Sequence, residues 1–214
     1  MLMKNNKVAV FDVDGTLTSK DTFLEFLKFV KGKNFFIWCL IANSPYIILY
    51  YLKLIPNYRL KEYFFSFYFK NEPEEGVLKL GREFALSQFP NLIYRAASQV
   101  LNWHRQNGHE VVFLTASSPI WLGPWCSEQG IHIAGTDFEV SNGRYTGKIL
   151  GKNCYGREKI PRLTTILNSL NIHEVEYAYG DSPADQYFLK LAKYSIPFPL
   201  TKKIVTEKIN YVLS

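Results

Sequence analysis

Short apolar runs alternate with helix-length amphipathic stretches along most of this 214-residue chain. The apolar runs are rich in β-branched and aromatic residues, which favours strands. These predicted strands are Lys7–Phe11, Glu110–Thr115, Ile131–Ala134, Val175–Gly180 and Tyr194–Pro197. The helices predicted between them are Ile93–Gln106, Pro119–Gln129, Glu158–Leu170 and Ala184–Ala192. Continuous apolar strands separated by helices are typical of a parallel sheet covered on both faces, so we expect a three-layer α/β core.

Two segments depart from this alternation. Phe138–Ile149 alternates apolar and polar residues around Asn142-Gly143, a pair that favours the tight turn of a β-hairpin. The stretch from residue 20 to residue 89 has helical apolar spacing, which predicts a helical insert after the first strand. We therefore expect a core formed by residues 1–18 and 93–214, with an inserted helical domain at residues 19–92.

Within this insert, Phe35–Leu52 runs for 18 residues without a charge. That length touches the lower limit for a membrane span, which needs about 20 apolar residues. Asn43-Ser44-Pro45 stands in its middle, and we expect Ser44 to be an N-cap with Pro45 at the first helical position. Two short helices are therefore predicted. We expect them to form an aromatic bundle with its own core, with a hairpin that lies on a membrane surface as the alternative.

The charge of the chain is concentrated in the same insert. The net charge is +6, and residues 20–70 hold eight Lys/Arg against three Asp/Glu. A basic, aromatic segment suits either an anionic membrane face or a small helical domain with an apolar interior. Because no nucleic-acid-binding motif accompanies it, we expect no nucleic acid partner. The three cysteines are too few for a disulfide scaffold, and no signal-peptide pattern precedes Lys7, so we expect a cytoplasmic protein.

Two carboxylates follow the first predicted strand at once, in the sequence Asp12-Val13-Asp14-Gly15. Ligands of open α/β sheets bind beyond the carboxyl ends of the strands, where this segment is expected. Carboxylates at positions i and i+2 reach one pocket when the chain curls away from the strand, and such an oxygen site suits Mg²⁺. Standing alone, the motif would be equally typical of a solvated Asp-Gly turn.

Further polar groups stand at the other predicted strand and helix ends. The hydroxyl of Thr115 and the free backbone N–H groups that follow, beginning at Ala116, would bind a phosphoryl oxygen. Lys159 begins a predicted helix and would neutralise phosphate charge. Asp181 and Asp185 follow the fourth strand. Each has an ordinary structural explanation, but their succession at neighbouring strand ends indicates a phosphate site with a metal.

Taken in order, these motifs resemble those of the haloacid dehalogenase-like phosphohydrolase superfamily over nearly the whole chain. The matching segments are DVDGTLT, the LTASS strand end, the GREK lysine and GDSPAD. The resemblance implies a three-layer, Rossmann-like parallel sheet with an inserted helical cap. It also implies Mg²⁺-dependent hydrolysis of phosphomonoesters through an aspartyl-phosphate.

The resemblance further implies a role for each matching residue. Asp12 would be the nucleophile, and Asp14 the general acid and then the general base. Asp12, Asp181 and the backbone carbonyl of Asp14 would hold Mg²⁺, while Asp185 would support this metal shell without binding the ion directly. The phosphoryl group would be bound by Thr115, Ala116 and Lys159.

The insert between the first and second motifs acts as a cap that selects the substrate in this superfamily. Its length here resembles that of the phosphoserine-phosphatase-like branch. Asp21 stands where those enzymes carry a glutamate that meets the substrate amine, and Arg59 stands near a cap arginine that holds the substrate carboxylate. The shorter arm of Asp21 argues against phosphoserine, and Arg59 is as well explained as a solvated residue of a cap helix.

The basic, aromatic cap is also similar to that of bacterial phosphatidylglycerophosphate phosphatases of the same superfamily. A lipid phosphomonoester has an apolar body and an anionic head, which such a cap could meet through peripheral membrane contact. The expected substrate is thus a phosphorylated small molecule or a lipid phosphomonoester, with phosphoserine and phosphatidylglycerophosphate as alternatives. A non-catalytic phosphate or Mg²⁺ sensor on a similar sheet is a further alternative, against which the presence of both Asp12 and Asp14 argues.

Overall fold

A computed structural model describes residues 7–204; the outer ends of the predicted core, residues 1–6 and 205–214, lie outside the described residues. A five-stranded sheet with the order β3-β2-β1-β6-β7 forms its centre, and all neighbouring strands in it are parallel. The strands are β1 (Val8–Phe11), β2 (Glu110–Leu114), β3 (His132–Ala134), β6 (Val175–Tyr179) and β7 (Ala192–Ile196). The predicted parallel α/β fold is confirmed.

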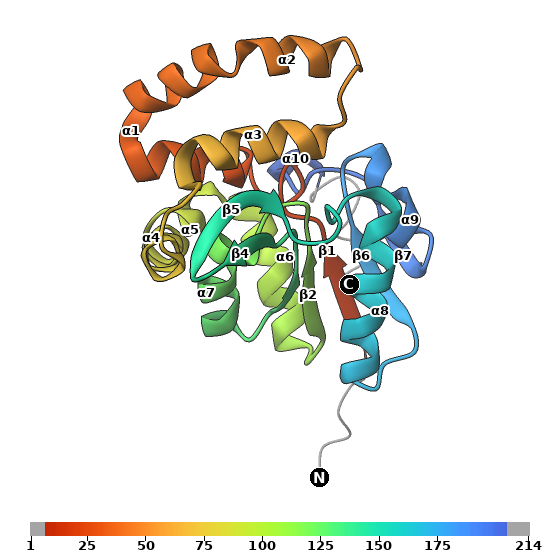
Figure 1. The fold of residues 1–214 in the computed structure, drawn as a ribbon. Coiled ribbons are helices and arrows are strands. Elements are labelled where there is room, and N and C mark those ends of the chain that lie inside the picture. The colour runs from red at the N-terminus through yellow and green to blue at the C-terminus, as the bar shows by residue number, and fades with distance from the viewer. Residues whose placement is uncertain (1–6, 205–214) are drawn as a thin grey trace.

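Helices cover both faces of this sheet (Figure 1). The helices of the core are α6 (Arg95–Gln106), α7 (Pro119–Gln129), α8 (Lys159–Ser169), α9 (Gln186–Leu189) and the short α10 (Lys202–Ile204). Side chains alternate along β1: Ala9 and Phe11 share one buried cluster with residues of α6 and α7, whereas Val8 and Val10 share another with residues of α8 and α9. Two separate apolar cores, one on each face, make the fold three-layered.

The predicted hairpin is present as β4 (Phe138–Ser141) and β5 (Arg144–Ile149), paired antiparallel. Asn142 and Gly143 form its turn, with φ angles of 51° and 71°. These left-handed values are the ones that a type I′ turn requires, and asparagine and glycine reach them at the lowest cost. The hairpin packs beneath the helices inserted after β1, where Phe65 stacks on Phe138 at 3.5 Å between ring centroids.

Five helices separate β1 from α6, and together they form the helical insert. They are α1 (Thr22–Ala42), α2 (Ser44–Tyr51), α3 (Asn57–Phe69), α4 (Glu74–Ser87) and α5 (Phe89–Leu92). The insert has an aromatic interior of its own. The ring of Phe26 lies 5.6 Å from those of Phe69 and Phe84, and 5.1 Å from that of Trp121 in the core. Among the described residues, no helix has both the length and the apolar composition needed to cross a membrane.

The helix α1 is broken at Gly32, whose φ of 78° and ψ of 168° lie outside the helical region. Figure 1 shows the chain turning there, so that the second half of α1 and the whole of α2 form the layer farthest from the sheet. Glycine reaches such a positive φ without a steric penalty, and no atom lies within 4 Å of where its Cβ would be. This turn directs residues 33–51 across the insert instead of along its core.

Two details of the sequence prediction are wrong. Asn43, not Ser44, is the N-cap of α2, and Ser44 is its first helical residue. Asn43 also ends α1, where its side-chain amide donates to the carbonyl of Cys39 (2.9 Å), so the chain passes from one helix to the next through this single residue. The helix predicted at Ala184–Ala192 is a 3₁₀ turn followed by the four-residue α9, and Ala192 belongs to β7. It does so because it pairs with Val175 of β6, which draws the chain into the sheet earlier than its local pattern indicates.

Candidate active site

The side chain of Asp12 projects from the end of β1, beyond the carboxyl edge of the sheet. Its backbone N–H donates to the carbonyl of Tyr179 at the end of β6 (2.9 Å), which fixes the position of the residue between the two strands. The residue is only 7% exposed. Burial raises the pKa of Asp12 to about 7, against the lowering effect of the Lys159 ammonium. A second cation beside this carboxylate would favour its charged form.

Lys159 supplies a buried cation to this site from the first turn of α8. Its Nζ donates to Asp12 Oδ1 (2.6 Å) and to Asp185 Oδ1 (2.7 Å), and the residue is 2% exposed. Burial alone would lower the pKa of Lys159, but the charges and hydrogen bonds of the two carboxylates raise it above its usual value. Lys159 is therefore a permanent positive charge against the oxygen of Asp12.

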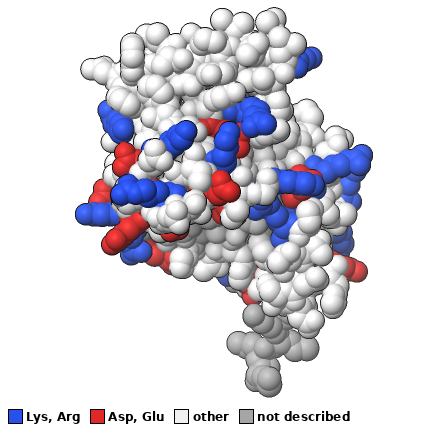
Figure 2. Space-filling model, viewed as in Figure 1, with Lys and Arg blue, Asp and Glu red and all other residues white. Residues whose placement is uncertain are grey.

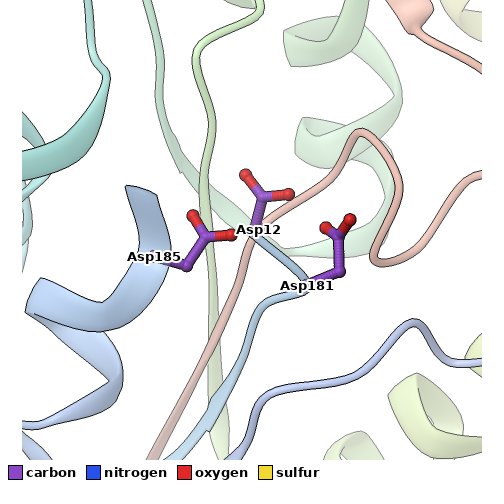
Figure 3. Close-up of side chains that lie close together, drawn as sticks. All are labelled: Asp12, Asp181 and Asp185. Atoms are coloured by element: carbon purple, nitrogen blue, oxygen red, sulfur yellow. The ribbon is translucent and has the colours of Figure 1, made fainter. Parts of the chain in front are cut away.

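Asp12, Asp181 and Asp185 form a cluster of carboxylates, and one oxygen of each lies within 4.8 Å of the others. Figure 3 shows them converging from the ends of β1 and β6 and from the turn before α9. Three oxygen donors of this charge are suited to a hard divalent cation such as Mg²⁺. Burial raises the pKa of Asp181. A bound cation would offset this effect, so the donor set fits the predicted metal.

The contacts of the cluster distinguish Asp185 from its neighbours. Asp185 Oδ2 accepts hydrogen bonds from the N–H (3.0 Å) and hydroxyl (2.7 Å) of Ser182, and its Oδ1 accepts from Lys159. Both oxygens of Asp185 are thus bound within the protein, which suits a residue that supports the metal site without binding the ion. The hydroxyl of Thr16 lies 2.6 Å from Asp181 Oδ1 and 3.2 Å from Asp12 Oδ2.

Asp14 lies beside the same pocket and is held by two donors. Its Oδ1 accepts from the N–H of Thr22 (2.7 Å) at the start of α1, and its Oδ2 accepts from the hydroxyl of Ser117 (2.6 Å). One contact comes from the insert and the other from the loop after β2. Asp14 therefore joins the insert to the core at the site itself.

The loop after β2 is built around Thr115, which is fully buried. Its backbone N–H donates to the carbonyl of Ala134, and its Oγ1 accepts from the N–H of Ser117 (3.0 Å). Ser118 then caps α7 by accepting from the N–H of Ile120. The loop places Ala116 and Ser117 on the wall of the pocket, whereas Thr115 lies behind it. The Ser117 N–H is bound to Thr115, so the Ala116 N–H is the backbone donor suited to a phosphoryl oxygen.

A cavity of about 520 Å³ connects these residues with the helical insert. Asp12, Asp14, Ala116 and Lys159 line its floor. The insert supplies its apolar and aromatic lining: Phe23, Leu24, Leu40, Ile47, Tyr50, Tyr51, Leu60 and Phe64. Further polar lining comes from both parts, such as Asn57 of the insert and Ser182 of the core. The cavity thus joins a polar, charged end to an apolar end.

Two residues of the insert bring charge to this cavity. Asp21 caps α1 by accepting from the N–H of Leu24 (3.0 Å). Its removal from bulk water and the charge of Asp14 raise the pKa of Asp21 to about 6. Lys61 reaches down from α3 and donates to the carbonyl of Ala116 (2.5 Å) and to Asn153 Oδ1 (3.2 Å). Burial lowers the pKa of Lys61 to about 8.

Arg59 of α3 was a second candidate for substrate binding, and the structure places it elsewhere. Its guanidinium donates to Glu62 (3.1 Å) and lies over the ring of Tyr58, and it is not among the described residues that line the cavity. The cation that the insert presents to the site is Lys61. Sequence reasoning missed Lys61 because it stands in no motif. Its only signal is its position on the same helix, two residues after Arg59.

A buried carboxylate paired with a lysine, an oxygen cluster suited to a divalent cation and a loop suited to phosphate lie together at one sheet edge. This arrangement defines an α/β enzyme that handles a phosphoryl group. A model of the haloacid dehalogenase-like hydrolase family matches residues 9–190. The chain belongs to this family, and the prediction of a phosphatase-type enzyme within it is confirmed.

Known proteins agree with this placement. Protein CicA of Caulobacter vibrioides (strain NA1000 / CB15N) is 30% identical over 187 residues, which cover 86% of this chain and 82% of CicA. A protein of unknown function from Bordetella pertussis Tohama I has the same fold, with a TM-score of 0.71, 21% identity and 86% of both chains covered. A phosphoserine phosphatase solved as a phospho-aspartyl intermediate analogue matches with a TM-score of 0.62 and 20% identity, over 95% of this chain and 91% of that one.

Proposed function

We propose that this protein is a Mg²⁺-dependent phosphomonoester hydrolase that works through an aspartyl-phosphate on Asp12. The observation that carries the proposal is the pairing of the buried Asp12 carboxylate with Lys159 at 2.6 Å, beside the Asp181 carboxylate and the loop of Thr115. This pairing positions the carboxylate and shields it from bulk water, and together with a bound Mg²⁺ it would favour the charged form that a nucleophile needs. The second acid, Asp14, in the same pocket supports turnover over a mere phosphate sensor, because it can serve as the acid and base of the reaction.

The reaction has two displacements. In the first, an oxygen of Asp12 forms a bond to phosphorus, the ester bond breaks, and Asp14 gives its proton to the leaving oxygen. In the second, Asp14 removes a proton from a water molecule whose oxygen attacks the phosphorus, which releases phosphate and restores Asp12. General acid–base steps of this kind contribute roughly 10²–10⁴-fold each.

The neighbours of Asp12 offset the charge that gathers during both steps. Lys159 and the backbone N–H of Ala116 would bind the phosphoryl oxygens. Mg²⁺ would be held by Asp12, Asp181 and the backbone carbonyl of Asp14, and it supplies charge neutralisation between nucleophile and phosphate. Asp185 would act by orienting Lys159 and supporting the metal site, since both of its oxygens are already bonded.

The helical insert, residues 19–92 in the predicted division, would serve as a cap over this site. Thr22 contacts Asp14 and Lys61 contacts Ala116, so both contacts fall on residues of the proposed chemistry. The cavity lies between the insert and the core and is lined by both. A cap in this position would exclude water and select the leaving group.

The proposal is tested with 4-nitrophenyl phosphate, an aryl phosphate that requires no particular cap contact. The wild-type protein should release phosphate only when Mg²⁺ is present, and Asp12→Asn should reduce kcat by at least about 10⁴-fold, since it removes the covalent route. Glu174→Gln, an exposed change remote from the site, is the matched control and should keep full activity. Equal activity of wild type and Asp12→Asn would contradict the mechanism.

For the substrate, the cavity lining favours a lipid phosphomonoester over phosphoserine. Its apolar end is formed by residues such as Leu40, Ile47 and Tyr51 of α1 and α2, which suit an acyl or glyceryl-acyl body better than an amino acid. Asp21 does line the cavity, but its side chain is also occupied as the cap of α1. Phosphate release from phosphatidylglycerophosphate and from phosphoserine, measured side by side, decides between them. Preference for phosphoserine would overturn the lipid assignment.

A further inference from the structure

The layer farthest from the sheet exposes an unusual amount of apolar side chain. We call residues 35–54, which comprise the second half of α1, α2 and the turn after it, the apolar arm. Its exposed fractions are 58% for Trp38, 60% for Ile41, 58% for Ile48, 78% for Tyr51, 62% for Leu52 and 67% for Leu54. In Figure 2 the top of the molecule is almost free of charged groups, which gather lower down. Contiguous apolar surfaces of this kind mark interaction sites.

The exposure follows from the way the arm is held. Phe36, Cys39 and Asn43 are its buried positions, so it touches the rest of the insert along one narrow side. The helix α2 has no buried residue at all. The inner residues Leu40, Ile47 and Tyr50 face the cavity instead. Among residues 7–204, folding therefore leaves the outer side of the arm without a partner.

Charge around the arm identifies the partner. Residues 26–61 contain six Lys/Arg and no Asp or Glu, and within them residues 34–52 carry no charge of either sign. Lys31 and Lys33 stand at one end of the arm and Lys53 at the other, all three exposed. A second copy of this chain docked through the same face would bring these cations against each other. An anionic lipid surface offers the opposite charge at the rim and apolar tails beneath it.

We propose that the apolar arm lies in the interface of an anionic membrane, with Trp38, Ile41 and Ile48 among the acyl chains and the flanking lysines at the phosphate groups. The docking itself stands on the surface and does not depend on catalysis. The role of this docking in catalysis rests on the proposed function, because the inner side of the same arm lines the cavity that ends at Asp12. A docked arm would place the apolar end of that cavity beside the lipid.

The test is sedimentation of the full chain with two kinds of vesicle, one of phosphatidylcholine alone and one of equal parts phosphatidylcholine and phosphatidylglycerol. We expect at least about tenfold tighter binding to the anionic vesicles, because each lysine near such a surface adds roughly 1 kcal/mol. The double variant Ile41→Glu/Ile48→Glu should lose at least tenfold in this binding. Leu150→Glu changes an exposed leucine of the core (56% exposed) and is the matched control.

Two further readouts make every outcome decisive. Neither Ile41 nor Ile48 lines the cavity, so the double variant should hydrolyse 4-nitrophenyl phosphate at the wild-type rate, which also shows that it folds. Lipids brominated on their acyl chains should quench the fluorescence of Trp38, and Trp38→Phe should remove that quenching.

Equal binding to both vesicles, or equal loss in the Leu150→Glu control, would overturn the proposal. A dimer in sedimentation velocity that becomes a monomer in the double variant, without vesicle binding by the wild type, would show that a second copy covers the arm. Vesicle binding by a protein that cleaves no phosphate ester would leave the docking intact and reject the proposed function.

Discussion

At the residue scale, Lys61 is a charged residue of the cavity that lies outside all of the sequence motifs. It is the cation that the helical insert directs into the cavity, and its ammonium is bound by a backbone carbonyl and an amide oxygen rather than by a carboxylate. Such a cation is available to an anionic substrate. It stands on the Asp14 side of the cavity, near Ala116, where the leaving group of the ester would be.

Lys61→Gln should lower kcat/KM by about 10- to 100-fold, the value of one hydrogen bond to a charged group in a partly buried site. Arg59→Gln is the matched control, because Arg59 lies on the same helix and pairs with Glu62 outside the cavity. It should change kcat/KM by less than about twofold. The measurement is steady-state hydrolysis of 4-nitrophenyl phosphate and of the preferred natural ester. Equal effects of the two variants would remove Lys61 from the site.

Gly15 shows how closely the first motif and Asp181 approach. A Cβ on Gly15 would lie 2.5 Å from Asp181 Oδ2, and the residue has a φ of 91°. Gly15→Ala should therefore displace the Asp181 carboxylate and raise the Mg²⁺ concentration needed for half-maximal activity by at least about tenfold. Gly151→Ala shares the positive φ (70°) but meets no atom within 4 Å. It should cost only about 1–2 kcal/mol of stability, with the Mg²⁺ dependence unchanged.

The residues of this site differ in how far sequence alone could place them. Asp12, Asp14, Thr115, Lys159 and Asp181 were predictable because each follows a strand or opens a helix of a parallel sheet, whose topology brings these ends together. Lys61 and Ser117 were not. Their contacts join the insert or the loop after β2 to Asp14 and Ala116, and they depend on tertiary packing that no local pattern encodes.

At the element scale, α6 is fastened to the sheet by a buried histidine. His104 is fully buried, and its ring nitrogens lie 2.8 Å from the hydroxyl of Tyr179 in β6 and 2.8 Å from Nδ1 of His109. Burial, followed by the neighbouring His109, lowers the pKa of His104 to about 3. The folded protein therefore keeps this ring neutral at pH values where the unfolded chain protonates it.

The neutral His104 ring makes the free energy of unfolding depend on pH. Below the unfolded histidine pKa of about 6.5 the unfolded state binds more protons, so His104 makes the free energy of unfolding fall as pH falls. Between pH 6.5 and 5 the loss should be about 2 kcal/mol. Asp12 and Asp21, with raised pKa values, act in the opposite direction, so the comparison must be with His104→Asn. Urea unfolding at both pH values should show a smaller loss in this variant; an equal loss would contradict the account.

The secondary-structure elements differ in how well the sequence pattern predicts them. The five strands of the sheet and the hairpin around Asn142-Gly143 were predictable, since each has a clear apolar pattern or a turn with a steric requirement. The structure of Ala184–Ala192 was not predictable from its helical spacing, because Ala192 pairs with Val175 and so belongs to a strand. The outward course of the apolar arm follows from the backbone turn at Gly32, which the sequence pattern does not show. Composition alone favoured an aromatic bundle over a surface hairpin.

At the scale of the whole molecule, the site is assembled from both the core and the insert. Asp14 binds Thr22, Ala116 binds Lys61, and the Gly147 carbonyl of β5 binds Ser66 of α3. The carboxylates and Lys159 lie on the core, while the insert supplies the apolar lining together with Asp21 and Lys61. The single cavity thus has a charged end and an apolar end.

Mg²⁺ should stabilise this whole assembly. At a concentration 100 times its Kd, a ligand bound only by the folded state adds about 2.7 kcal/mol, which corresponds to a rise in Tm of about 5–10 °C for a chain of this size. The rise in thermal unfolding should vanish in Asp181→Asn and persist in the exposed control Glu174→Gln. A Tm rise in Asp181→Asn as large as that of the wild type would show that the metal is held elsewhere.

The most direct test of the account is to look for the phosphate on Asp12 itself. Asp14→Asn removes the base of the second displacement, while 4-nitrophenol leaves readily without an acid. This variant, mixed with 4-nitrophenyl phosphate and Mg²⁺ and quenched in acid, should therefore accumulate one phosphoryl group per chain. Mass spectrometry should locate it on the peptide containing Asp12. Continued release of phosphate by this variant, with the Asp12 peptide unmodified, would contradict the covalent mechanism.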